Sequence, residues 1–461
     1  MSFSTRNATI VSCFGLAVLC GLTNNARAAG FALREQSAEG LGDAFAGQTA
    51  KAYNASTVFY NPAGMTNLNG NEVAGTTTWI APVSEFRGSN SNVVGGTVSG
   101  RSDLNAIKAA AIGSVFGVWD ASRDWKFGMS IATPFGMRAD YKPDWVGRYQ
   151  ALASDVTDVD VSVVGAYKID DHLSVGGGPR VDYLKARLSQ AINFNAIGLQ
   201  TAAKYQAAAA AGQMSVAAAT AAAQTAASWG DGLGKVEGDD LGVGYNLGML
   251  YVFNPATRVG LDYRSRSAHT LSGTVTNQTP ATLALAGATA NLFINQNATA
   301  KITLPDSMNL GGYHEINNQW AILSDVQWTH WSLFKQLNVI GANGQAISST
   351  NENWQDTWFL SLGTNYKITD KWTLHGGIAF DQSAVKNASY RTARIPDSNR
   401  YWLSTGASYA LSSATELHLG YTHIFADKAS ISETANSLSG VLTGNYSNSV
   451  DIVSTSFVVR F

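Results

Sequence analysis

The sequence predicts an all-β fold: a transmembrane antiparallel β-barrel of about 14 strands with an N-terminal hatch, a plug that contains short helices. The chain is 45% hydrophobic and only 14% charged. Past the first thirty positions, however, polar residues interrupt every apolar run before it reaches the roughly 20 residues that a membrane helix needs. Period-two alternation and a succession of short turns and long polar loops favour strands instead. A secreted β-sandwich or propeller is the alternative.

Residues 1–28 resemble a signal peptide. Arg6 supplies the positive charge, an apolar stretch covers residues 8–22, and Ala26 and Ala28 occupy the small-residue positions that signal peptidase reads. A short membrane anchor is the alternative. Both cysteines, Cys13 and Cys20, precede the expected cleavage site after Ala28. We therefore expect a mature chain without disulfides or thiolate sites.

Two segments depart from the strand pattern. Residues 29–70 are rich in Gly, Ala and Ser and are expected to form short helices that plug the lumen, with a flexible periplasmic tail as the alternative. An alanine-rich stretch within residues 192–230 predicts a helical extracellular loop, because alanine is the strongest helix former, although a disordered loop is also consistent. We assign the remainder, residues 71–461, to the barrel.

The alternation is clearest in residues 241–253. Every second residue from Leu241 to Phe253 is apolar or aromatic, and those between Leu241 and Met249 are small or polar. Such a strand presents one apolar face. The last strand does the same and ends in Phe461, which resembles the terminal aromatic signal of outer-membrane barrels. Closure is required, since an open edge in lipid leaves backbone groups without partners.

Charge and motifs narrow the function classes. A net charge of −2 argues against nucleic-acid binding, which usually needs a clustered basic surface. No nucleophile elbow or metal-spaced histidine pair is present, so we expect no catalytic residues, no metal site and no cofactor. His330, His418 and His423 leave an outer-membrane phospholipase as a weak alternative.

Several blocks occur in a shared order with a known family. They are residues 29–31 (AGF), 37–42 (SAEGLG), 61–65 (NPAGM), 304–306 (LPD), 320–322 (WAI), 331–332 (WS), 377–381 (GIAFD), 395–397 (IPD) and 400–404 (RYWLS). In these blocks the chain resembles the FadL long-chain fatty acid transporters of the outer membrane and their TodX-like relatives. The resemblance extends over nearly the whole mature chain.

The resemblance implies a monomeric barrel whose lumen is blocked by the hatch. Ligand would enter between long extracellular loops, reach an inner pocket and leave sideways through an opening made by an inward kink in the third strand. The gating residues would be Asn61, Pro62 and Ala63 of the hatch, which contact the kink, and Pro134, Phe135 and Gly136 of the strand. Proline and glycine suit a place where a strand leaves its ladder. Pro134 could alternatively end a strand at a loop.

The expected ligand is a long-chain fatty acid. Where the family places basic side chains toward the carboxylate, this chain has Gln190 and Asn338. The candidate substrate-binding residues are therefore the nearby Lys185, Arg187 and Lys335, together with Phe31. The same three basic residues could instead be rim charges that contact lipopolysaccharide.

The departure at Gln190 and Asn338 raises an aromatic hydrocarbon or alkane as alternative cargo. An open porin for polar solutes and a surface adhesin are further alternatives. The expected partners are a hydrophobic ligand, outer-membrane lipid and lipopolysaccharide, and the barrel-assembly machinery during insertion.

Overall fold

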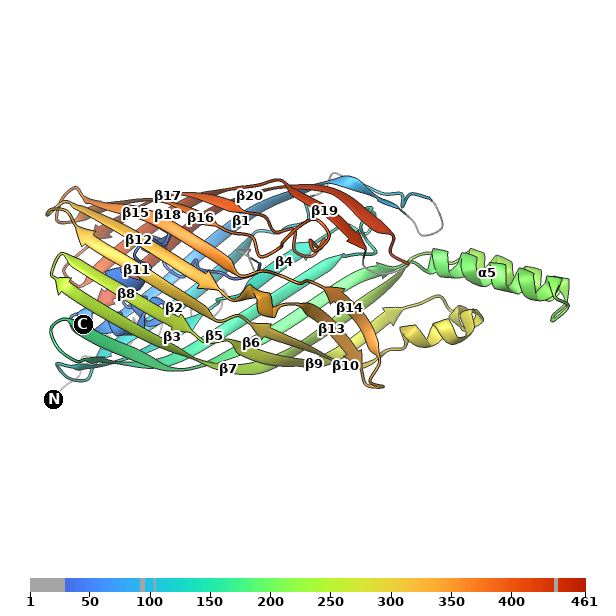
Figure 1. Ribbon diagram of the computed structural model, residues 1–461, viewed down its shortest axis with the longest axis horizontal. Helices are drawn as coiled ribbons and strands as arrows, with labels where there is room; N and C mark the ends of the chain where they lie inside the picture. The colour runs from blue at the N-terminus through green and yellow to red at the C-terminus, as the bar shows by residue number, and fades with distance from the viewer. Residues whose placement is uncertain (1–29, 92–95, 103–104, 435–437) are drawn as a thin grey trace.

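The computed structural model describes residues 30–91, 96–102, 105–434 and 438–461, so the expected signal peptide lies outside the described residues. The chain forms one antiparallel sheet rolled into a closed barrel (Figure 1). Closure is made by the first and last strands: Glu72 to Ser91 of β1 pair with Arg460 to Val441 of β20. This pairing of the first and last strands closes the sheet, as a lipid environment requires.

The wall has 14 strands, which confirms the predicted fold. Eight run without a break: β1 (Glu72–Ser91), β2 (Ala110–Asp120), β5 (Ala153–Lys168), β6 (Leu173–Ile192), β7 (Gly232–Asn254), β16 (Trp372–Asp381), β17 (Arg400–Ala410) and β20 (Val441–Arg460). Six are interrupted: β3 (Trp125–Ala132) with β4 (Gly136–Asp140), β8 (Thr257–Arg264) with β9 (Ser267–Gln278), β10 (Gln296–Leu304) with β11 (Ser307–Glu315), β12 (Trp320–Thr329) with β13 (Gln336–Gly341), β14 (Ala346–Asn351) with β15 (Thr357–Lys367), and β18 (Thr415–Ala426) with β19 (Ala429–Thr434). A short 3-10 helix, η3 (Trp331–Leu333), lies in the break between β12 and β13.

The two ends of the barrel differ. At one end the strands are joined by short turns, such as residues 255–256 between β7 and β8, and Phe461 exchanges backbone hydrogen bonds with Asn71. Longer loops, including residues 193–231 and 382–399, lie at the other end. Short periplasmic turns and long extracellular loops are the outer-membrane arrangement.

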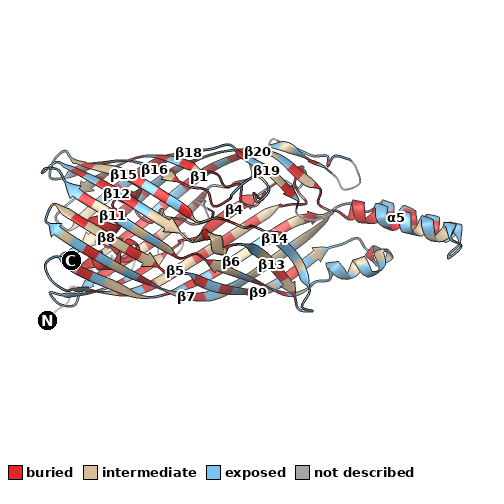
Figure 2. Ribbon diagram, viewed as in Figure 1, coloured by how far each residue is buried: buried red, intermediate tan, exposed pale blue. Residues whose placement is uncertain are grey.

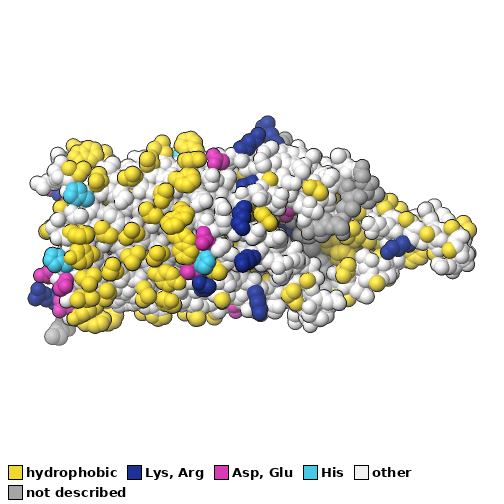
Figure 3. All heavy atoms as spheres, viewed as in Figure 1, with side chains coloured by type: hydrophobic (Ala, Val, Ile, Leu, Met, Phe, Trp, Pro, Cys, Tyr) yellow, Lys and Arg dark blue, Asp and Glu magenta, His cyan; other side chains and the backbone are white. Residues whose placement is uncertain are grey.

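A belt of exposed apolar side chains surrounds the barrel on its periplasmic side (Figure 3). Buried and exposed residues alternate along each strand, because successive side chains point to opposite faces (Figure 2). Aromatic pairs border the belt near the turns: Trp125 with Tyr167, and Trp320 with Tyr366, at ring distances of 4.7 and 4.5 Å. These are the interfacial aromatics expected at the edge of a bilayer.

Residues 30–70, here called the N-terminal segment, lie inside the barrel (Figure 1, dark blue). They form α2 (Ala38–Gly42), α3 (Gln48–Lys51), α4 (Thr57–Tyr60) and the 3-10 helix η1 (Pro62–Asn67). The segment is attached to the wall by polar contacts. For example, Arg258 donates to the carbonyls of Ala50 and Lys51, and Asp325 accepts from Thr49.

The alanine-rich stretch forms two packed helices, α5 (Phe194–Ala210) and α6 (Val216–Ala227), which project beyond the barrel at the loop end (Figure 1). They contact the 3-10 segment η2 (Leu283–Phe293) of a neighbouring loop. Among the described residues, no helix is both long and apolar enough to cross a membrane.

Candidate ligand-binding cavity

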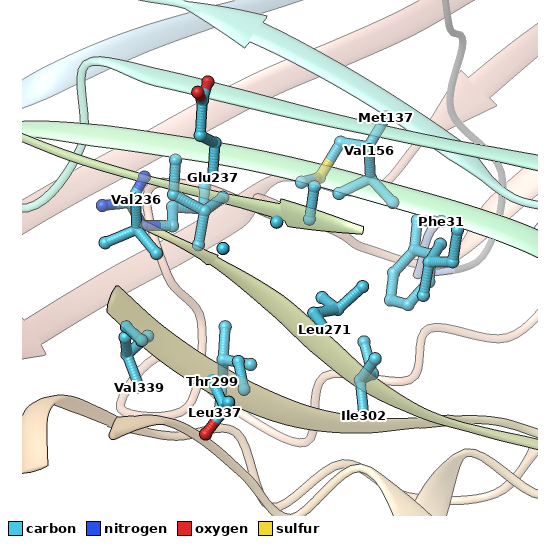
Figure 4. A pocket seen from close by; sticks show the side chains of 18 of the residues that line it. Phe31, Met137, Val156, Val236, Glu237, Leu271, Thr299, Ile302, Leu337 and Val339 are labelled. Atoms are coloured by element: carbon cyan, nitrogen blue, oxygen red, sulfur yellow. The ribbon is translucent and has the colours of Figure 1, made fainter. Parts of the chain in front are cut away.

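An apolar cavity of about 820 Å³ lies inside the barrel above the N-terminal segment (Figure 4). Alternating residues of adjacent strands supply its wall: Leu184, Ala186 and Leu188 of β6; Val236 and Gly238 of β7; Leu271 and Gly273 of β9; Ala298, Ala300 and Ile302 of β10; Leu337 and Val339 of β13. A mostly apolar lining with a few polar groups at one end is typical of a small-molecule site.

Phe31 forms the floor of this cavity, within an aromatic cluster. Its ring lies 4.9 Å from Trp331, 5.9 Å from Phe135 and 6.0 Å from Trp354. Gly30 places Phe31 there: it has a left-handed φ of 61°, and a Cβ atom on it would lie 2.5 Å from the Trp354 ring. Only glycine combines that backbone conformation with so close an approach.

The opposite end of the cavity is polar because of Arg394, which comes from the loop of residues 382–399. Its Nη1 donates to the Ala153 and Ser189 carbonyls and to Ser154 Oγ, and its Nη2 donates to Gln190 Oε1 at 2.9 Å. Burial lowers the pKa of Arg394, but a guanidinium in a protein stays charged. The four acceptors are uncharged, and the nearby carboxyl groups of Glu433 and Glu352 favour the charged form of Arg394.

Glu352 shares this polar end. Its carboxylate accepts a hydrogen bond from Trp354 Nε1 at 3.1 Å. Burial, followed by the charge of Glu433, raises the pKa of Glu352 to about 8. At neutral pH the side chain is therefore mostly protonated. Arg394 is then the cation nearest to an otherwise apolar space.

The cavity continues outward into a larger space of about 1950 Å³ between the extracellular loops. Leu188, Val236, Leu337, Glu352 and Arg394 line both spaces. The outer space adds polar groups such as Gln150, Asn193 and Gln345 and the apolar Leu292 and Phe293 of η2. Arg394 thus stands where a polar outer chamber meets an apolar inner one.

The third wall strand breaks beside the Phe31 cluster. β2 pairs with β3 only as far as Ile131, and β4 pairs with β5. Between β3 and β4 the chain turns to the N-terminal segment instead: Leu33 N donates to Pro134 O at 2.7 Å, and Gly136 N donates to Phe31 O at 2.8 Å. Gln36 holds Thr133 by hydrogen bonds to its carbonyl and amide. Pro134 therefore interrupts the strand without ending it.

Pro134 and Phe135 also line a further space of about 900 Å³ below the aromatic floor, between the N-terminal segment and the wall. Its apolar residues include Leu33, Phe59 and Phe359, and its polar residues include Arg34 and Gln327.

Asn61, Pro62 and Ala63, which were expected to touch the kink, contact β6 and β7. Asn61 Nδ2 donates to Met249 O of β7, and Cβ atoms added at Gly176 or Gly248 would collide with the Asn61–Ala63 turn. The turn is thus seated against β6 and β7, where two glycines give it room. Residues 31–36 contact the kink in its place.

The structure also places Lys185, Arg187 and Lys335 away from the cavity. All three are exposed on the outside of the barrel, and Arg187 pairs there with Asp155. Leu184, Ala186 and Leu188 face inward, so period-two geometry turns Lys185 and Arg187 outward. Of the four candidate substrate-binding residues, only Phe31 lines the space.

The basic residue that does line the cavity, Arg394, was missed. It lies in a loop without alternation, and its one signal was its position directly before the Ile395-Pro396-Asp397 block. Gln190, noted for the lack of a positive charge, accepts a hydrogen bond from it.

The histidines do not form a metal cluster. Within residues 30–91, 96–102, 105–434 and 438–461, no group of three or more His, Cys, Asp or Glu side chains is arranged to hold a metal ion. His418 bonds to Ser408, His330 to Asp306, and His423 to Asp451.

Comparison with known proteins gives a consistent result. The family described as "Outer membrane protein transport protein (OMPP1/FadL/TodX)" matches residues 19–461. The long-chain fatty acid transport protein of Escherichia coli K12 is 28% identical over 92% of this chain and 94% of its own length. A 47 kDa outer membrane protein of Pasteurella multocida is 30% identical, covering 91% of each chain.

Solved structures agree in fold. A FadL homologue from Pseudomonas aeruginosa superposes with a TM-score of 0.81 at 23% identity, covering 94% of this chain and all of its own. The toluene transporter TodX of Pseudomonas putida gives 0.65 at 15% identity, again covering 94% and 100%.

Proposed function

The chain belongs to the OMPP1/FadL/TodX family of outer-membrane transport proteins, and from this we propose that it carries long-chain fatty acids passively across the outer membrane. The acid would enter through the outer space between the loops. Its carboxylate would then meet Arg394 while its tail occupies the apolar cavity above Phe31. Fatty acid transport is the printed function of the Escherichia coli relative.

The observation that carries this proposal is a half-buried arginine, Arg394, at the mouth of an apolar cavity. A hydrogen bond to a charged group contributes about 1.5–3 kcal/mol. Each buried methylene contributes about 0.8 kcal/mol. The two ends of the cavity thus suit the two ends of a fatty acid.

The break between β3 and β4 supports a sideways exit. Phe31 separates the upper cavity from the lower space that Pro134 and Phe135 line. Movement of residues 31–36, which bond to the break, would join the two spaces beside the gap between β2 and β4. An apolar tail that left through this gap would reach lipid without crossing water. We propose Phe31, Gln36, Pro134, Phe135 and Gly136 as the gating residues.

Uncharged hydrocarbons are the second candidate. Both Nη atoms of Arg394 already donate to protein oxygens, so a carboxylate must displace or share one of those bonds. An aromatic hydrocarbon would need only the apolar part of the cavity. The likeness in fold to a toluene transporter is compatible with such cargo.

Ligand binding to the purified protein distinguishes the two candidates. Arg394→Gln removes the charge, and Lys185→Gln is the matched control, because Lys185 lies on the outside of the same wall. For fatty acid cargo we expect Arg394→Gln to weaken oleate binding at least about tenfold. Toluene binding should stay unchanged, and Lys185→Gln should bind both ligands like the parent protein. Equal oleate affinity in all three proteins would contradict the assignment.

Uptake tests the transport claim itself. In cells that lack their own transporter, expression of the protein should restore uptake of oleate. Ala300→Trp, which fills the cavity from β10, should abolish it. Uptake of neither oleate nor toluene would contradict hydrophobic transport altogether.

A further inference from the structure

Outside the cavity, three exposed lysines form what we call the basic patch: Lys301 of β10, Lys335 just before β13, and Lys386 in the loop after β16. Figure 3 shows Lys and Arg side chains in a column just beyond the hydrophobic belt, on its extracellular side. The wall elements that carry the patch are neighbours, since β10 pairs with β13.

Lys301 faces outward from β10, and contacts with Asn353 bring Lys335 and Lys386 together. Lys301 points outward because its neighbours on either side, Ala300 and Ile302, line the cavity. The Lys335 carbonyl accepts a hydrogen bond from Asn353 N at 2.8 Å. Lys386 Nζ donates to Asn353 Oδ1 at 3.3 Å. Lys335 and Lys386 therefore meet at one residue, Asn353, and both side chains stay exposed.

Acidic side chains on this part of the wall do not neutralise the patch. Between residues 266 and 400 the extracellular half contains five acids, four of which are buried: Asp306, Glu352, Asp381 and Asp397. The fifth, Asp356, accepts hydrogen bonds from Trp328 and Ser332. The exposed acids Glu237 and Asp239 stand on β7, in register with Arg187 and Lys185 of β6.

The surface around the lysines carries hydroxyl and amide groups and few apolar ones. Exposed neighbours on the outer face are Thr270, Ser272, Thr274, Asn297 and Gln336. Gln336 and Ser349 are already hydrogen-bonded across β13 and β14 at 2.6 Å. Hydroxyls and amides can bond to sugar hydroxyls, and lysine ammonium groups bind phosphate as point charges.

We propose that the basic patch binds a phosphorylated glycolipid of the outer leaflet, the chemistry of lipopolysaccharide. The patch lies directly beyond the lipid-facing belt, so the headgroup layer of the same membrane is the anionic surface nearest to it. Three like charges without acidic neighbours complement several phosphates on one headgroup. The acyl chains of that lipid would cover the exposed Met308 and Leu310 of β11, which continues from β10 into the belt.

The test compares two triple variants in purified, detergent-solubilised protein. Lys301→Gln, Lys335→Gln and Lys386→Gln together remove the patch. Lys168→Gln, Lys367→Gln and Lys371→Gln remove the same charge at the periplasmic turns. Affinity is measured for purified lipopolysaccharide and for the same material after chemical removal of its phosphates. Oleate binding and heat-modifiable migration on gels report whether each barrel is folded.

We expect the patch variant to bind intact lipopolysaccharide at least tenfold more weakly while its oleate binding and folding are unchanged. The periplasmic variant should bind like the parent, and dephosphorylated lipopolysaccharide should bind weakly to all three proteins. An equal loss of lipopolysaccharide affinity in both triple variants, or no loss of affinity in the patch variant, would overturn the proposal. If millimolar inorganic phosphate alone displaced the bound lipopolysaccharide, the patch would be a general phosphate site, and the lipid would be overturned as its ligand. These results are independent of which ligand the inner cavity transports.

Discussion

At the scale of single residues, Arg394, Glu352 and Glu433 determine the charge at the mouth of the cavity. Arg394 is fixed by four hydrogen bonds to uncharged oxygens. Glu352 is buried beside the same space, and its pKa is raised to about 8. An ionised Glu352 would compete with a ligand carboxylate for Arg394, whereas its neutral form would not.

This arrangement predicts a pH dependence. As the pH rises from 7 to 9, Glu352 loses its proton, and a carboxylate ligand meets a negative charge at the site. Oleate binding should weaken severalfold over that range. Glu352→Gln should lose oleate affinity less steeply from pH 7 to 9, with Glu433 as the remaining carboxyl beside Arg394. Toluene, which has no charge, serves as the control ligand. Oleate affinity that is flat in the parent protein would contradict this role for Glu352.

At the scale of elements, the alternation within strands was predictable, but its polarity changes along each strand. In β7 the outward face is apolar from Leu241 to Phe253 and charged at Lys235, Glu237 and Asp239. The inward face of β7 changes in the opposite sense: it is small or polar at Gly242, Gly244 and Asn246 and apolar at Val236, which lines the cavity. A sequence interpretation that assumes polar residues point inward everywhere therefore misplaces Lys185 and Arg187. The place where the outward face turns charged marks the edge of the lipid.

The position of Phe31 and the break at Pro134 could be anticipated from the sequence. The seat of the Asn61–Ala63 turn could not, because it depends on which distant strands carry facing glycines. The position of Arg394 at the cavity could not be predicted either, because loop residues have no periodicity that shows which way they point.

The glycine seat gives a testable consequence. A Cβ atom at Gly176 would lie 2.6 Å from Ala63 N and 2.7 Å from Pro62 C, both backbone atoms. Gly176→Val should therefore displace the N-terminal segment. Gly165→Ala is the control, because the nearest atom to its Cβ is 3.7 Å away. We expect ionic conductance in planar bilayers to rise for the first variant alone. Equal conductance in both variants would contradict the claim that Gly176 makes room for the Asn61–Ala63 turn.

A buried ion cluster gives a second consequence for the same segment. Lys51 Nζ lies 2.9 Å from Asp43 and 3.4 Å from Glu39, and all three side chains are buried. Lys51→Met leaves buried acids without their cation, so we expect it to destabilise the fold by about 3–5 kcal/mol. Lys168→Met breaks only an exposed pair with Asp171 and should cost about 1 kcal/mol or less. Heat unfolding in detergent measures both, and similar midpoints would contradict the expectation.

At the scale of the whole molecule, the wall and the N-terminal segment have separate tasks. The wall is closed by the pairing of β1 with β20 and carries the lipid-facing belt. The segment fills the lumen with buried contacts and contributes Phe31 to the cavity floor. A water-filled porin has neither a filled lumen nor an apolar chamber.

This organisation predicts almost no steady conductance for the intact protein in planar bilayers. Deletion of residues 30–70 should produce large, steady conductance if the barrel still folds, which heat-modifiable migration reports. A large conductance in the intact protein would favour an open porin.

The most direct test of the account is to locate a ligand inside the barrel. Crystals grown with a fatty acid brominated near the end of its tail would reveal the bromine by anomalous scattering. We predict a bromine peak among Leu271, Ala300 and Ile302, with the carboxylate within hydrogen-bonding distance of Arg394. Bromine found only on the outer belt, with an empty cavity, would contradict the account.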